Sequence, residues 1–137
     1  MKIIFKEVKA MDIRSIENIP PNMEHDGTVA VWWMYKPREM FEATKGGFLE
    51  LVSEFEIQGG QKVHPHKHPT HEFYYVTHGR GIMKIGNETK QVYQGDLIRI
   101  PPDEIHSLWP IGENASIHCF CFAIGEKGIQ PIDYTTY

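Results

Sequence analysis

The stretch HPHKHPTHE, residues 64–72, places four of the chain's eight histidines immediately before a glutamate. In an extended strand, side chains two residues apart point to the same face, so His66 and His68 present two imidazoles to one side. Glu72 lies four residues beyond His68 and can return to that face. A third imidazole would complete a set of nitrogen and oxygen ligands that suits Fe(II), Mn(II), Ni(II), Zn(II) or Cu(II). His106, which follows a proline-rich turn, is the natural candidate.

The rest of the chain has the pattern of an all-β protein, because short runs rich in Val, Ile, Phe and Tyr alternate with Gly, Pro and Asn. In the run 48–57, alternation predicts a buried face with Leu49, Leu51, Phe55 and Ile57 and a solvated face with Glu50, Glu54 and Glu56. Strands are predicted at 28–35, 48–57, 64–68, 72–77, 81–85, 89–93, 96–100, 106–109 and 116–124. Gly86-Asn87 indicates a hairpin turn, and Pro37 to Thr44 fits either a helical turn or a loop. Such spacing is typical of a sandwich or a closed barrel.

Composition narrows the class of protein. A chain of 137 residues with 41% hydrophobic residues fits one globular domain. The net charge of −4 comes without a basic stripe, which argues against nucleic acid as a partner. The charged start, Met1 to Ala10, lacks the apolar core of a signal peptide and no run reaches membrane-spanning length, so we expect a cytoplasmic protein. Cys119 and Cys121 share a strand face, which makes a mutual disulfide awkward and favours reduced, packed thiols.

The sequence resembles the cupin superfamily. The first motif of that family is a glycine, five residues, His-x-His, three or four residues, Glu, six residues and a glycine. Every fixed position of this motif is matched here, by Gly60, His66, His68, Glu72 and Gly79.

The second motif is a glycine, five residues, Pro-x-Gly, two residues and His, and it is met by Gly95, Pro101 and His106. Asp103 replaces the turn glycine and should keep the turn, because Asp tolerates the left-handed backbone conformation. Pro110 stands where the family often has asparagine, which affects only the strand end.

The resemblance implies a single-domain cupin, a double-stranded β-helix or jelly-roll barrel. Its core should span residues 48–124, with an N-terminal extension at 1–47 that contains at least one strand and a C-terminal tail at 125–137. It further implies one divalent metal ion per chain, Fe, Mn, Ni or Zn, held by His66, His68, Glu72 and His106. A homodimer is expected from the family alone.

Three functions fit such a site. The first is a dioxygenase-type oxidoreductase acting on a small oxygenated molecule that chelates the metal, with Glu72 as ligand or proton shuttle. The second is a redox-neutral lyase, isomerase or decarboxylase in which Tyr74, on the face of Glu72, moves a proton and has its pKa lowered by the metal. The third is a non-enzymatic cupin that binds a small molecule.

The remaining histidines have lesser predicted roles. His64 and His71 are expected beside the site or at the surface, and His78 and His25 in solvated turns and loops. His118 fits either the core or the pocket wall.

Overall fold

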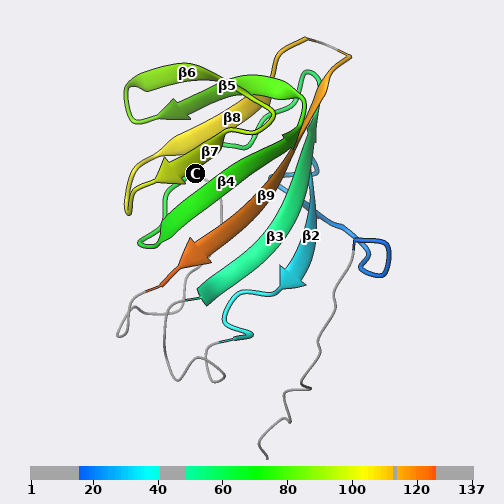
Figure 1. Cartoon of the computed structure of the whole chain (residues 1–137), viewed down its shortest axis with the longest axis vertical. Coiled ribbons are helices and arrows are strands. Elements are labelled where there is room, and N and C mark those ends of the chain that lie inside the picture. The colour runs from blue at the N-terminus through cyan, green and yellow to red at the C-terminus, as the bar shows by residue number, and fades with distance from the viewer. Residues whose placement is uncertain (1–15, 41–48, 113, 126–137) are drawn as a thin grey trace, which may run out of the picture.

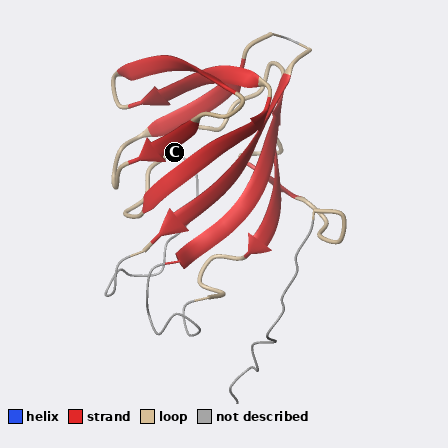
Figure 2. Ribbon diagram, viewed as in Figure 1, coloured by secondary structure: helices blue, strands red, loops and turns tan. Residues whose placement is uncertain are grey.

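The computed structural model describes residues 16–40, 49–112 and 114–125. Strands are the only regular elements in these ranges (Figure 2). In chain order they are β1 (Asn22–Glu24), β2 (Val29–Tyr35), β3 (Leu49–Gln58), β4 (His71–His78), β5 (Arg80–Ile85), β6 (Glu88–Tyr93), β7 (Leu97–Ile100), β8 (His106–Pro110) and β9 (Ser116–Ile124).

The strands form two antiparallel sheets that close into a jelly-roll barrel, as Figure 1 shows. The larger sheet has the order β1-β2-β3-β9-β4-β7, and the smaller has the order β6-β5-β8. All pairings are antiparallel, and the first and last parts of the barrel meet where β3 pairs with β9 along nearly its whole length. Chain segments far apart in the sequence therefore line one interior.

Alternation along the strands sets the core between the two sheets. On β9 the side chains of Ile117, Cys119, Cys121 and Ala123 are all buried and point inward, whereas the residues between them are half-buried. The two cysteines share a face and are free thiols, as predicted. Burial raises the pKa of Cys119 to about 12, so this thiol is a packing group rather than a nucleophile.

Eight of the nine predicted strands are present, and the prediction for residues 64–68 is wrong. This segment is extended but makes only one bridge, between His66 and His106. The ninth strand of the structure is β1, which lies outside the nine predicted ranges. Pro65 and Pro69 lack the N–H that a regular ladder requires.

The prediction that Glu50 lies on the solvent-exposed face of its strand is also wrong. An irregularity in the pairing of Leu49 and Leu51 with β9 breaks the alternation, so that Glu50 is buried. Its Oε1 lies 3.5 Å from Nε of Arg38, whose charge compensates the buried carboxylate.

The predicted turns agree with the structure where it describes them. Gly86-Asn87 joins β5 to β6, and Asp103 has the left-handed φ of 62° expected at the turn glycine of the motif. Pro110 is the last residue of β8. Residues 37–40 form a turn, whereas 41–48 and the tail at 126–137 lie outside the described residues.

The two glycines of the first motif give a prediction on stability. Both have positive φ, +82° at Gly60 and +83° at Gly79, but a Cβ at Gly79 would overlap the carbonyl oxygen of Ser116, whereas a Cβ at Gly60 meets nothing within 4 Å. Gly60→Ala should cost about 1 kcal/mol of unfolding free energy, and Gly79→Ala about 2 kcal/mol more. Urea unfolding measures both, and equal losses would show that the Ser116 contact is unimportant.

Candidate metal centre

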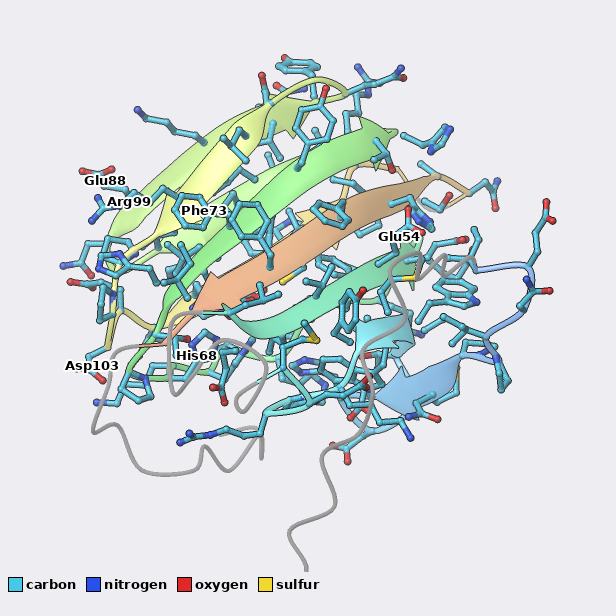
Figure 3. All side chains as sticks on the ribbon, turned by 60° about the horizontal axis from the view of Figure 1, so that its bottom comes forward. Glu54, His68, Phe73, Glu88, Arg99 and Asp103 are labelled. Carbon is cyan, nitrogen blue, oxygen red and sulfur yellow. The ribbon has the colours of Figure 1, made fainter. Side chains whose placement is uncertain are left out.

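Three imidazoles converge at one point inside the barrel. His66, His68 and His106 each offer a ring nitrogen, and these nitrogens lie within 4.8 Å of one another. The bridge between the extended segment and β8 brings them together: the His66 N–H donates to the carbonyl of His106 at 3.2 Å, and the His106 N–H donates to the carbonyl of His66 at 2.9 Å. Figure 3 shows His68 at the end of the barrel that also holds Asp103, whose N–H donates to the carbonyl of His68 at 2.9 Å.

Hydrogen bonds on the far side of each ring fix its orientation. Nδ1 of His66 donates to the carbonyl of His64 at 2.7 Å, and Nδ1 of His106 donates to the carbonyl of Glu104 at 3.0 Å. Because a carbonyl only accepts, both rings carry their proton on Nδ1 and keep a lone pair on Nε2. Nδ1 of His68 lies 2.9 Å from the hydroxyl of Thr70, which can accept in the same way. This is the arrangement by which proteins orient metal-binding histidines.

The lone pair of His106 has no partner in the described part of the chain. Its Nε2 is a buried atom without a hydrogen bond, and burial lowers the pKa of the ring to about 4, so it stays neutral at pH 7. An unsatisfied buried polar atom costs roughly 1–3 kcal/mol. A metal ion would satisfy it, so the residues present fit such a group.

Glu72, on β4, extends the cluster on the side of His68. Its carboxylate contacts Nε2 of His68 and accepts a hydrogen bond from the Cys121 thiol at 3.4 Å. Burial alone would raise its pKa, but the hydrogen bond to His68 and the charges of the three imidazoles lower it to about 2. Glu72 does not belong to the group of three residues whose ligand atoms all lie within 4.8 Å of one another, so it stays a predicted ligand.

Tyr74 lies two residues further along β4 on the same face. The side chain is buried, and its ring packs edge-on against Phe55 with centroids 4.9 Å apart and lies 6.1 Å from the ring of His106. Burial, together with the charge of Glu72, raises the pKa of the phenol well above its usual value. In the metal-free protein this keeps the hydroxyl protonated as a donor, and the lowering expected from a neighbouring cation stays a prediction.

Of these groups His66, Glu72, Tyr74 and Cys121 border a small cavity in the barrel. Apolar side chains, among them Val29, Leu51 and Phe55, form most of its wall, and Glu24 and Ser53 add further polar groups. Its volume of about 80 Å³ is far below the ~300–1,000 Å³ typical of sites for drug-sized molecules. A ligand of only a few non-hydrogen atoms would fit.

His25 also lines this cavity, although the sequence predicted a solvated loop. It lies in the turn between β1 and β2, with its ring centroid 5.0 Å from that of His66, and its Nδ1 accepts the backbone N–H of His64 at 3.2 Å. Burial lowers its pKa to about 4. The contact between His25 and His64 joins residues 39 positions apart, and no local sequence pattern predicts it.

The other histidines lie outside the cluster. The side chain of His64 lies 3.7 Å from Asp26, and that of His71 lies 3.4 Å from Arg99. His78 is exposed, as predicted. His118 is neither in the core nor in the pocket wall, since it lies on the outer face of the large sheet beside Glu54 and Glu56.

Comparison with known proteins agrees with this fold and site. The family model of the cupin domain matches residues 53–121. An uncharacterised protein of Methanocaldococcus jannaschii is 33% identical over 107 residues, which is 77% of this chain and 79% of that protein. The chain belongs to the cupin family, and its three histidines are positioned to bind a metal ion in that fold.

More distant similarities add detail. The gentisate 1,2-dioxygenase of a Haloferax species is 36% identical over 53 residues, 39% of this chain but only 15% of that enzyme. A crystal structure of a predicted oxalate decarboxylase from Thermotoga maritima superposes with a TM-score of 0.70 at 23% identity, covering 83% of this chain and 98% of that one. A polyketide cyclase of Streptomyces resistomycificus superposes with a TM-score of 0.67 at 17% identity, covering 91% and 87%. In the described residues no helix has the length and apolar character of a membrane span.

The site gives a prediction on metal content. We expect one divalent ion per chain, and replacing His66 and His68 together by alanine should abolish it, because two of three converging imidazoles are lost. His64→Ala and His71→Ala should retain the metal, since neither side chain belongs to the cluster. Elemental analysis of the purified proteins measures the ratio. Stoichiometric metal in the double variant would contradict the assignment.

The lowered histidine pKa values give a second prediction, for the protein stripped of metal. His25 and His106 titrate near pH 4 when folded and near 6.5 when unfolded, so between these values the unfolded chain binds more protons. The unfolding free energy should be highest above pH 6.5 and lower at pH 5 than at pH 7 by on the order of 2–4 kcal/mol. Urea unfolding with a chelator present measures it. His25→Asn should reduce the difference, and a flat profile would contradict the prediction.

Proposed function

We propose that the protein is a metal-dependent cupin enzyme that acts on a small oxygenated molecule able to chelate the metal. The observation that carries this proposal is the set of three converging imidazoles, one of which, His66, lines a small, mostly apolar cavity. A structural zinc site is usually closed and has four ligands. Three histidines and one carboxylate on a metal that prefers six ligands leave two positions open.

A divalent ion held there, Fe(II), Mn(II) or Ni(II) in first place and Zn(II) next, would supply a net positive charge and open positions for oxygen atoms. The protein's own groups then act on the molecule in the cavity. The apolar wall limits its size and excludes water, Glu72 contributes a carboxylate, and Tyr74 presents a protonated hydroxyl.

A dioxygenase-type oxidoreductase is the first candidate. The similarity to gentisate 1,2-dioxygenase supports it, although it covers a short part of that enzyme. A cavity with open ligand positions and apolar walls also suits a substrate and dioxygen side by side.

A redox-neutral lyase, isomerase or decarboxylase is the second candidate, and the position of Tyr74 favours it. Tyr74 and Glu72 both line the cavity and are both buried, so one protonated donor and one carboxylate face the same small space. Such a pair can pass a proton between two positions of a bound molecule.

A screen for turnover decides between the two. The protein is loaded with each metal and incubated with small hydroxy acids, keto acids, enols and diketones, once in air and once without oxygen. Oxygen consumption that accompanies product formation supports the dioxygenase, and turnover without oxygen supports the lyase. Binding without turnover under all conditions would contradict an enzymatic function.

Tyr74→Phe gives a prediction that separates the candidates once a substrate is known. In a lyase or isomerase the change removes the proton donor, and turnover should fall about 10²- to 10⁴-fold with the fold and metal content intact. In a dioxygenase the loss should be small. The matched control is Tyr75→Phe, because Tyr75 is 42% exposed on the adjacent, outward position. Near-normal turnover of the Tyr74 variant would eliminate its role in proton transfer.

A further inference from the structure

The turn between β1 and β2 carries a histidine into the cavity from a part of the chain outside both cupin motifs. His25 and Asp26 have left-handed φ values of 52° and 57°, which residues with side chains adopt rarely. Backbone strain of this kind persists only where surrounding contacts hold it, and it concentrates at functional sites. The position of His25 is therefore fixed by other parts of the protein.

Two contacts tie this turn to the segment that bears the metal-binding residues. The Thr28 hydroxyl lies 2.9 Å from the carbonyl of Lys62, and the His64 N–H donates to Nδ1 of His25 at 3.2 Å. The carbonyl of His64 in turn accepts from Nδ1 of His66. The backbone of His64 thus holds both rings: its N–H binds the ring of His25, and its carbonyl binds the ring of His66.

The hydrogen bond from the His64 N–H to Nδ1 fixes the tautomer of His25. A backbone N–H only donates, so Nδ1 must accept and cannot carry a proton. The neutral ring then has its proton on Nε2, and a second proton on Nδ1 would place two donors face to face. Nε2 has no hydrogen-bond partner among the described residues, so its N–H is available to donate to a molecule in the cavity.

We propose that His25 is a substrate-binding residue whose Nε2–H donates a hydrogen bond to an anionic oxygen of the molecule that chelates the metal. This rests on the metal-dependent function proposed above and deepens it. The ring lines the same cavity as His66, Glu72 and Tyr74, so a ligand in that cavity can reach both the metal position and His25. The small volume and the apolar wall limit the ligand to a short carboxylate or enolate with at least one oxygen that does not bind the metal.

Two substitutions separate this role from a purely structural one. The amide oxygen of asparagine takes the place of Nδ1, so His25→Asn keeps an acceptor for the His64 N–H and removes the Nε2–H donor. The amide nitrogen of glutamine takes the place of Nε2, so His25→Gln keeps the donor and loses the acceptor. The two variants are matched controls for each other.

The experiment uses the full chain loaded with Co(II), whose absorption bands report changes in its ligands. The probes are oxalate, which chelates a metal and leaves two oxygens free, and imidazole, which binds a metal but offers His25 no acceptor. We expect His25→Asn to bind Co(II) and imidazole as the unchanged protein does and to lose oxalate affinity about 10- to 100-fold, as for a hydrogen bond to a charged group. His25→Gln should bind oxalate with an affinity within about 3-fold of that of the unchanged protein, because it keeps the donor.

Three outcomes would overturn the proposal. Unchanged oxalate affinity in His25→Asn would show that Nε2 does not contact the ligand. Equal losses of oxalate in the two variants, or a parallel loss of imidazole or Co(II), would show that His25 only positions the segment 61–66. If the unchanged protein bound no Co(II), or bound Co(II) but no oxalate, the proposed function would fail as well, whereas the first two outcomes leave it standing.

Discussion

The pair of backbone hydrogen bonds between His66 and His106 is the contact on which the site depends. The two residues are 40 positions apart, yet their peptide groups exchange both hydrogen bonds and their rings lie 4.3 Å apart. Val63 adds a third bond from the same segment to β8, through the carbonyl of Leu108 at 2.9 Å. Without this bridge the extended segment would have no ladder to hold it, because its prolines cannot donate. The barrel therefore fixes His106, the bridge fixes His66, and the hydrogen bond from the Asp103 N–H fixes the backbone of His68.

The same local device orients the rings of His66 and His106. In each case Nδ1 donates to the carbonyl two residues earlier in the chain, that of His64 and that of Glu104. Side-chain orientation is thus set by backbone already held in place by the bridge, and it requires no polar side chain from elsewhere. His68 differs, because its Nδ1 faces the Thr70 hydroxyl and its Nε2 contacts Glu72. Two lone-pair groups in such contact need a positive charge between them, either a proton or a metal ion.

Local patterns in the sequence predicted what local geometry decides. Alternation found most strands, and the left-handed backbone of Asp103 was expected from its place at the turn glycine of the second cupin motif. Errors arose where a distant contact or a break in the ladder overrides the pattern. Pairing irregularity on β3 buries Glu50, and prolines keep residues 64–68 from forming a strand. The place of His25 at the cavity depends on the contacts of Thr28 with Lys62 and of His25 with His64, for which a single sequence contains no signal.

The polar groups around Glu72 are nearly all donors, and this has a consequence for the ligand. Tyr74 and Cys121 keep their protons because burial raises both pKa values, and Nε2 of His25 carries a proton because Nδ1 accepts. Among the described residues two carboxylates, Glu24 and Glu72, line the cavity, and the acceptor sites of Glu72 already face His68 and Cys121. With a divalent cation bound as proposed, these donors would favour an oxygen anion as the ligand over an amine or an alcohol.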